Sequence, residues 1–341
     1  MAGFQLSVRR SGQRDDQRAV DTTMSLSRRA LLATGAALSA GGLAPVRAAD
    51  EKRAGNKLKV AIFSKHLRFL EGEELAKNVA ELGFDAVDLT VRRGGHVEPA
   101  RVKQELPRLV SAIRQHGLEV PMLTTDIVDA DSPHAEDILR SMSELGIHHY
   151  RWGGFRYAPE GSLAAQIDAL KPGIAKLASL NSQYRACAMY HTHSGTGLVG
   201  ASIWDLHILL KNFDPNAVSV NYDIGHATIE GGFGGWINSL RITGPHLRGV
   251  AVKDFVWASD GPGKWHPQWT PLGEGMVHFQ QFFAMIADSH FSGPLQLHFE
   301  YPLVGADSGQ AKLTGSREVV FHAMKRDLHR LRAYLVESKL A

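Results

Sequence analysis

Val218-Ser-Val-Asn-Tyr-Asp-Ile-Gly-His226 is the stretch from which the organisation of the whole chain can be worked out. Its alternating, β-branched first half predicts a strand that ends at Asp223, and a histidine follows three residues later across a glycine. In a parallel barrel, such a strand end presents polar side chains to the face that carries the chemistry. Two interpretations of Asp223 compete: it is a metal ligand beside His226, or it is the N-cap of the next helix.

The alternation of strand and helix continues on both sides of this stretch. Seven further strands are predicted at residues 58–64, 85–91, 118–126, 147–152, 184–193, 247–254 and 294–300. Helices are predicted at residues 71–82, 99–116, 133–145, 163–180, 277–289 and 317–336. Eight such units predict an α/β fold, a single (β/α)8 TIM barrel over residues 49–341. A doubly wound sheet is the alternative, but Phe63-Ser-Lys-His66 stands where it would need a Gly-rich turn.

Residues 1–48 predict a cleaved export signal. Arg28 and Arg29 precede a weakly hydrophobic run over residues 30–43, and Pro45-Val-Arg-Ala48 supplies a cleavage site after Ala48. A membrane anchor is the alternative, but the run is too short and too rich in Gly and Ala to span a bilayer. We therefore expect twin-arginine export to the periplasm, no stable membrane anchor, and a true start at either Met1 or Met24.

Removing this leader changes the charge of the chain. It holds seven arginines and three aspartates, so the 38 basic and 35 acidic residues of the whole chain become 31 and 32, a net charge of about −1. A near-neutral body predicts no nucleic-acid partner. The single Cys187 excludes an intrachain disulfide. The expected partners are a small carbohydrate, the twin-arginine export machinery and a second copy of the chain in a homo-oligomer.

The predicted strand ends are dense in histidine and carboxylate. They supply Lys65 and His66, Asp88, Thr125 and Asp126, Arg151, Tyr190, His191 and His193, Asp223 and His226, Lys253 and Asp254, and His298 and Glu300. Imidazole and carboxylate without thiols suit one Mn, Co, Zn, Fe or Mg ion. For any single histidine, a hydrogen-bonded structural role is the alternative, and only convergence at one end of the barrel favours a metal.

Five motifs resemble a known family. They are Tyr190-His-Thr-His193, Asp223-Ile-Gly-His226, Val252-Lys-Asp254, Pro271-Leu-Gly-Glu-Gly275 and Phe299-Glu-Tyr301. In this order, between about Lys57 and Leu335, they are similar to the xylose isomerase-like TIM barrels, also described as the sugar phosphate isomerase/epimerase or AP endonuclease family 2 superfamily. The leader suggests a twin-arginine-exported subgroup of it.

The resemblance implies a divalent ion held by Glu, Asp, His and Glu on strands five to eight. Asp223 and Glu300 match this pattern, and His191 stands in place of the first Glu. Ala251 stands where the strand-seven His is expected, which departs from the family. His226 is the predicted fourth ligand, with His193 and His298 as alternatives.

The resemblance also implies a sugar isomerase or epimerase that removes a proton next to a carbonyl. Glu300, Lys253 and His193 are the predicted catalytic residues. Lys253 has two alternative roles, to polarise the carbonyl or to pair with Asp254. The predicted substrate-binding residues are His66, Asp88, Arg92, His96, Arg151, Trp257 and Trp265. The two tryptophans lie in a long connection over residues 255–275, which predicts a lid or binding loop, although they could instead pack that loop onto the barrel rim.

Three other functions are alternatives to a sugar isomerase or epimerase. A lyase or hydratase of 3-keto-glycosides begins with the same proton removal, and a substrate phosphate is not expected for an exported protein. An endonuclease needs more zinc ligands and a basic face. A non-catalytic sugar-binding barrel with a degenerate metal site is the alternative that Ala251 leaves open.

Overall fold

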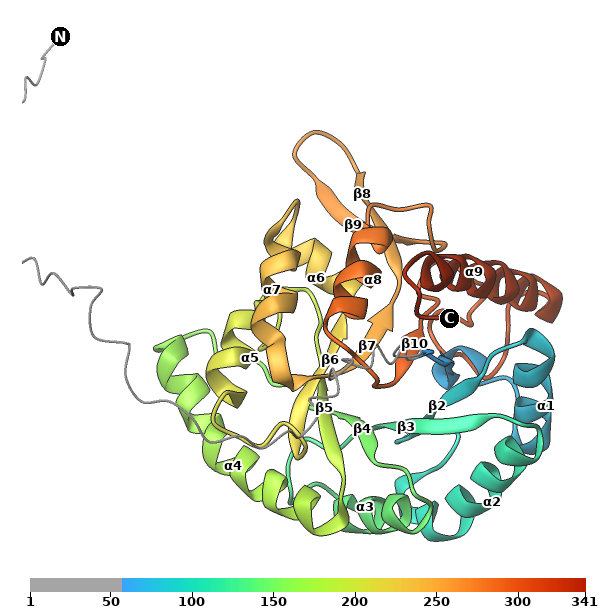
Figure 1. Cartoon of the computed structure of the whole chain (residues 1–341), viewed down its shortest axis with the longest axis horizontal. Helices are drawn as coiled ribbons and strands as arrows, with labels where there is room; N and C mark the ends of the chain where they lie inside the picture. The colour runs from blue at the N-terminus through green and yellow to red at the C-terminus, as the bar shows by residue number, and fades with distance from the viewer. Residues whose placement is uncertain (1–56) are drawn as a thin grey trace, which may run out of the picture. The chain divides into compact units, whose positions relative to one another are not determined.

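The computed structural model describes residues 57–341, in which eight parallel strands close into a barrel (Figure 1). The strands are β1 (Val60–Phe63), β2 (Ala86–Val91), β3 (Glu119–Thr125), β4 (His149–Trp152), β5 (Cys187–His191), β6 (Val218–Asp223), β7 (Leu247–Val252) and β10 (Leu295–Leu297). Pairing of β10 with both β7 and β1 closes the ring. The predicted TIM barrel is therefore confirmed, while the leader lies outside the described residues.

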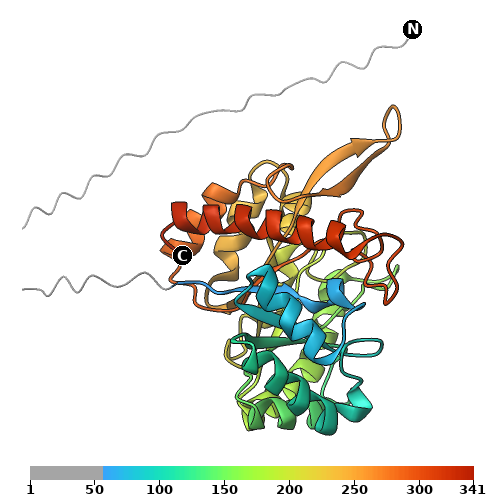
Figure 2. The ribbon, with the colours of Figure 1, turned by 90° about the vertical axis from the view of Figure 1, so that its right-hand side faces the viewer.

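Helices surround this barrel (Figures 1 and 2). They are α1 (Gly72–Leu82), α2 (Val102–Gln115), α3 (Ala135–Glu144), α4 (Leu163–Tyr184), α5 (Ile203–Leu210), α6 (Ile224–Gly231), α7 (Gly235–Thr243), α8 (Phe279–Asp288) and α9 (Arg317–Glu337). The sequence did not predict α5, α6 or α7. The first is short and apolar on most sides, and the other two carry helix-weakening glycines. None of the helices within residues 57–341 is both long and apolar enough to cross a membrane.

Strand β6 shows how the alternating pattern positions polar groups inside the barrel. Tyr222 points outward, and its hydroxyl donates to the Trp236 carbonyl of α7 at 3.0 Å. Successive strand residues face opposite sides, so Asn221 and Asp223 point inward. Asn221 lies in the barrel interior, where it contacts Gln296 of β10 at 2.7 Å. Asp223, the last strand residue, is therefore delivered to the open end of the barrel.

The long connection after β7, predicted to be a lid or binding loop, has regular structure. It forms an antiparallel hairpin of β8 (Asp254–Ser259) and β9 (Trp265–Thr270). Both Figure 1 and Figure 2 show the hairpin reaching beyond the barrel. Its sequence alternates, and Asp260-Gly-Pro-Gly263 supplies the turn, a hairpin signal that the length of the connection concealed.

Candidate active site

Three buried side chains bring metal-ligating atoms together at the carboxyl ends of the strands. One nitrogen of His191, one of His298 and a carboxylate oxygen of Asp223 all lie within 4.8 Å of one another. Oδ2 of Asp223 and both ring nitrogens of His298 have no hydrogen-bond partner among the described residues. Buried polar atoms without partners are rare because they lose their hydration. Their convergence therefore fits a cation, so this is a possible metal site.

The nearest positive charge in the structure is the ammonium group of Lys253. Its Nζ lies 2.8 Å from Oε2 of Glu300 and 3.3 Å from Oδ2 of Asp223. It also donates to Nε2 of His226 at 2.7 Å. A metal ion and this ammonium group would therefore share the Asp223 carboxylate.

The two oxygens of Asp223 have different roles. Oδ1 accepts a hydrogen bond from the backbone N–H of His226 at 3.0 Å, which caps α6. Oδ2 faces Lys253 and lies 3.4 Å from Nε2 of His191. The helix-cap interpretation is thus confirmed, and it leaves the second oxygen available to a cation.

Both carboxylates of the site are held in their ionised form. Burial alone would raise the pKa of Asp223, but Lys253, His226 and His298 together outweigh it, so the pKa lies below its usual value. Burial also acts to raise the pKa of Glu300, and Lys253 and Lys65 together hold that pKa well below its usual value. Burial lowers the pKa of His191 and His298 well below the ordinary range, so both rings are neutral. Neutral imidazoles and ionised carboxylates are the forms that bind metals.

The residues that cluster in the structure are not the same four residues that the sequence predicted as metal ligands. His191 and Asp223 belong to the buried trio, whereas His298 takes the place predicted for His226 and Glu300. Both nitrogens of His226 are engaged, Nε2 with Lys253 and Nδ1 with Ser194 Oγ at 2.8 Å. Lys253 pairs with Glu300 and Asp223 and, within the described chain, forms no ion pair with Asp254.

His193 lies beside this trio, on the loop after β5. Its ring centroid is 4.6 Å from that of His191. Its Nε2 accepts from Nη2 of Arg151 at 3.1 Å, and its Nδ1 lies 3.1 Å from the His191 carbonyl oxygen. Burial, and then the charge of Arg151, lower the pKa of His193 to about 4. Proton transfer by His193 would therefore require the Arg151 contact to open.

Two predicted substrate-binding histidines are fully engaged with the protein. Nδ1 of the buried His66 contacts the Ala306 carbonyl oxygen at 3.1 Å, and its Nε2 accepts from the Phe299 N–H at 3.1 Å. His96 contacts Thr90 Oγ1 at 3.0 Å and the Leu67 carbonyl oxygen at 3.3 Å. His66 and His96 therefore have the hydrogen-bonded structural role that is the alternative to ligand binding for any single histidine.

Three other predicted substrate-binding residues lie on β2, directly after it, or on β4. Asp88 is buried and accepts from Thr124 Oγ1 at 2.8 Å, and burial raises its pKa to about 7. The Arg92 guanidinium lies 5.7 Å from the ring centroid of Phe63. Arg151 contacts His193, as described above. These three residues place polar groups on the side of the barrel mouth opposite the hairpin.

The hairpin brings a different tryptophan to the site from the two predicted. Trp265 is 64% exposed and Trp257 is 40% exposed. Trp269 instead lies over Lys253, whose Nζ is 4.2 Å from the ring centroid, and its edge meets His226 at 4.9 Å between centroids. Trp265 and Trp269 are four residues apart and share one face of β9, but Trp265 pairs with Ser259 near the turn, whereas Trp269 pairs with Phe255 near the base of the hairpin. Trp269 is thus the tryptophan that could shield the Lys253 charge from water.

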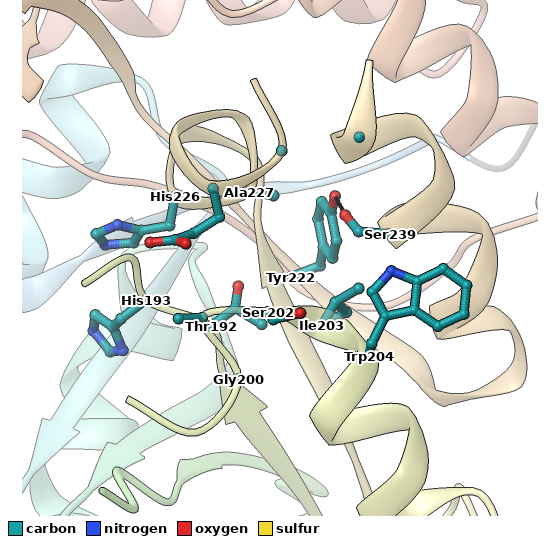
Figure 3. Close-up of a pocket in the computed structure, with 14 residues that line it drawn as sticks. Thr192, His193, Gly200, Ser202, Ile203, Trp204, Tyr222, His226, Ala227 and Ser239 are labelled. Carbon is teal, nitrogen blue, oxygen red and sulfur yellow. Dashed lines mark hydrogen bonds between the residues drawn. The ribbon is translucent and has the colours of Figure 1, made fainter. Parts of the chain in front are cut away.

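A pocket of about 220 Å³ lies next to these groups. Figure 3 shows His193 and His226 on one side of it and Trp204 on the other. Tyr222 and Ser239 line it and are hydrogen-bonded at 2.6 Å. Trp204, which no sequence pattern singled out, is 52% exposed. The pocket therefore extends from the buried histidines towards α5 and α7.

Comparisons with known proteins agree with this architecture. A model of the family described as "Xylose isomerase-like TIM barrel" matches residues 76–317. The inosose dehydratase of Geobacillus kaustophilus (strain HTA426) is 23% identical over 253 residues, which cover 65% of this chain and 77% of that protein.

Two solved structures illustrate the shared fold. The apo form of 3-keto-D-glucoside 4-epimerase from E. coli superimposes with a TM-score of 0.58 at 16% identity, over 81% of this chain and 100% of that chain. A xylose isomerase-like TIM barrel protein from Mycobacterium smegmatis, in complex with magnesium, gives a TM-score of 0.59 at 16% identity, over 83% and 98% of the two chains. At such identities the likeness shows the fold alone.

Proposed function

The chain belongs to the xylose isomerase-like TIM barrel family, and from its site we propose that it is a divalent-metal-dependent isomerase or epimerase of a non-phosphorylated sugar or sugar derivative. The observation that carries this proposal is the buried cluster of metal-ligating atoms on Asp223, His191 and His298, next to the Lys253–Glu300 pair. Within the described residues, Oδ2 of Asp223 and both ring nitrogens of His298 in this cluster have no hydrogen-bond partner. A relative that is a dehydratase and a structural neighbour that is a 4-epimerase support it.

The residues of the chain divide into a cation-binding set and a proton-transfer set. His191, Asp223 and His298 would hold the ion, which when bound would polarise the carbonyl of the substrate and acidify the adjacent C–H. Glu300 is ionised and its side chain is 22% exposed, so it can reach substrate and accept that proton. Lys253, 2.8 Å away, can return a proton or stabilise the enediolate oxygen.

Replacement of Asp223 by Asn tests this proposal. Asn removes the charge that holds the cation, but its side-chain oxygen can still cap α6. We expect metal content to fall from about one equivalent to none, and deuterium exchange next to the carbonyl of keto-sugars in D2O to fall by at least about 100-fold. The measurements are elemental analysis and NMR of the recovered sugar.

Asp327→Asn is the matched control, because Asp327 is also a buried carboxylate but binds Tyr301 and Arg326 away from the site. It should retain both metal and exchange. A parent protein that binds no metal after soaking and catalyses no exchange, yet still binds sugars, would contradict the proposal and favour the non-catalytic barrel that Ala251 left open.

The second candidate is a lyase or hydratase of 3-keto-glycosides, favoured by the inosose dehydratase relative. It shares the proton-abstraction step, so both reactions exchange solvent deuterium. Product analysis with a 3-keto-glucoside separates them, because an epimerase conserves the mass of the substrate. A lyase instead breaks the glycosidic bond, releases the aglycone as an alcohol and leaves an unsaturated keto-sugar, to which a hydratase adds one water.

The export signal predicted over residues 1–48 leads us to propose a periplasmic location through the twin-arginine route. A processed protein that begins at Ala49 is expected in the periplasmic fraction. Replacement of Arg28 and Arg29 by Lys should keep the chain in the cytoplasm, and unimpaired export of that variant would contradict the route.

A further inference from the structure

The open side of the site carries more positive than negative charge. Lys65, Arg92, Arg151 and Lys253 are cations, and Asp223 and Glu300 are the carboxylates held in their ionised form. The nearby histidines are neutral. A divalent ion at Asp223 would increase this excess of positive charge. A neutral substrate would not compensate for it.

Four contacts bring two of these cations to one face of the site. Both Lys65 Nζ and the Arg92 guanidinium lie 5.7 Å from the ring centroid of Phe63. The same ring packs against His298 of the buried trio at 4.6 Å between centroids. Lys65 also lies 3.5 Å from Glu300. Charge at Lys65 and Arg92 is thus adjacent to the reacting groups.

A cavity continues from this face. It has a volume of about 380 Å³, and its lining includes Lys65, Arg68, Arg92 and Arg93, against the single carboxylate of Asp126. Asp126 is used by a backbone group, since its Oδ2 accepts from the Arg93 N–H at 2.9 Å. The cavity is therefore a polar, cationic space that opens beside the proton-transfer pair.

The arginines of this region form no close ion pair among the described residues, although the buried Asp88 carboxyl group interacts with Arg92 and Arg151 at longer range. Within residues 57–341, no carboxylate lies within 4.0 Å of the guanidinium nitrogens of Arg68, Arg92 or Arg151. Arg92 and Arg151 are largely shielded from solvent, as the intermediate exposure of both residues shows. Partly buried guanidinium groups without counter-charges are unfavourable unless a ligand supplies the charge. Their planar geometry suits bidentate recognition of an anionic oxygen pair.

We propose that the substrate of this barrel is a sugar acid, whose carboxylate lies against Arg92 and Lys65 while its carbonyl end reaches the Asp223 trio. This inference rests on the proposed function for the carbonyl end, but the anion site is defined by the cations alone. A sugar phosphate offers the same kind of charge and is the second source of anion that the experiment distinguishes.

The test is calorimetric binding of matched neutral and anionic sugars to the processed protein. D-gluconate and D-glucitol differ only by a carboxylate in place of a hydroxymethyl group, and D-glucose 6-phosphate is compared with D-glucose. We expect gluconate to bind at least about 10-fold more tightly than glucitol at low salt, with an advantage that falls as salt is added. The phosphate is expected to give a smaller advantage than the carboxylate.

Arg92→Gln should abolish the advantage of gluconate over glucitol. Arg241→Gln is the matched control, because Arg241 is exposed on α7, far along the chain from the cationic face, and its variant should keep the advantage. The inference is overturned if gluconate and glucitol bind equally or if neither binds. It is also overturned if the advantage of gluconate survives Arg92→Gln, because the carboxylate would then bind only to a metal. A larger advantage for the phosphate overturns the sugar-acid assignment.

Binding needs no turnover, so these outcomes are separate from the exchange assay. Loss of solvent exchange with retained gluconate preference would contradict the proposed reaction but not the anion site. Solvent exchange with neutral keto-sugars, without any preference for gluconate, would support the proposed reaction and contradict the anion site.

Discussion

A single buried amide determines which nitrogen of His191 carries the proton. Nε2 of Gln296 donates to the Pro294 carbonyl oxygen at 3.1 Å, so Oε1 of Gln296 is left to accept from Nδ2 of Asn221 at 2.7 Å. The second N–H of the Asn221 amide donates to Nδ1 of His191, with a nitrogen–nitrogen distance of 3.0 Å. Neutral His191 therefore holds its proton on Nε2, facing Asp223. Ligation through Nε2 requires the proton to move, which weakens metal binding.

Asn221→Asp should consequently tighten metal binding. A carboxylate would accept a proton from Nδ1 of His191 and free Nε2 for ligation, as in metal sites where an acid orients the histidine. We expect the metal dissociation constant to fall by about 10-fold or more, measured by competition with a chelator. Asn181→Asp is the control, because Asn181 is also buried but contacts Tyr150 and the Ala217 carbonyl oxygen. Weaker binding in Asn221→Asp would contradict this account of the tautomer.

At the scale of elements, the hairpin is held to the barrel by one carboxylate at its base. Asp254 accepts hydrogen bonds from the backbone N–H groups of Phe255, Gly273, Gly275 and Val277 at 2.9–3.2 Å. A side chain at Gly275 would overlap the Asp254 carboxylate, which explains this glycine. Because Trp269 lies on β9, the same anchor positions the ring that covers Lys253.

Asp254→Asn should therefore loosen the whole hairpin. The amide cannot accept the four hydrogen bonds equally, so buried N–H groups lose their partner at a cost of about 1–3 kcal/mol in the free energy of unfolding. We expect faster hydrogen exchange over residues 254–277 and slower turnover because Trp269 is displaced. Asp260→Asn is the control, since its contact to His266 at 3.2 Å is exposed and should contribute little. Unchanged exchange in Asp254→Asn would refute the anchor.

At the scale of the whole molecule, the barrel keeps an unusual number of histidines neutral. Burial lowers the pKa of eight histidines in the described part of the chain: His66, His96, His149, His191, His193, His226, His246 and His298. The unfolded chain binds protons at these residues below about pH 6.5, whereas the folded chain does not. Four carboxyl groups act in the opposite direction, because burial raises the pKa of Asp88 to about 7 and also raises the pKa of Asp205, Asp254 and Asp327, but they are fewer than the eight histidines.

The free energy of unfolding should therefore fall as the pH is lowered from about 6.5 to 4. Each buried histidine contributes up to about 1.4 kcal/mol per pH unit, because a folded-state pKa below the unfolded value favours the unfolded state in acid. Urea unfolding at pH 7 and pH 5 measures this slope. His149→Asn, which removes a group whose pKa burial lowers to about 4, should make the slope shallower. Replacement of the exposed His322 should leave it unchanged, and constant stability between these pH values would contradict the explanation.

Local periodicity determined the barrel and the residues at its strand ends. Alternation along Val218–Asp223 is a property of a few consecutive residues, so it placed Asp223 at a strand terminus and facing inward before any contact was known. The order of the motifs predicted the family, and the match of residues 76–317 to the model of that family confirmed it. The same local reasoning did not recognise α5 to α7, whose short segments carry weak periodicity. It also did not recognise the hairpin, whose alternation was concealed by the length of the connection.

Which strand-end groups meet was decided only by the tertiary structure. His298 joins His191 and Asp223 because side chains from non-adjacent strands meet at the centre of a closed barrel, and no spacing along the chain encodes that distance. Lys253 reaches both Asp223 and Glu300 because its flexible side chain bends towards two carboxylates that closure brings together. Strand pattern specifies a position and a direction, whereas barrel closure and side-chain rotamers set the distances on which binding and proton transfer depend.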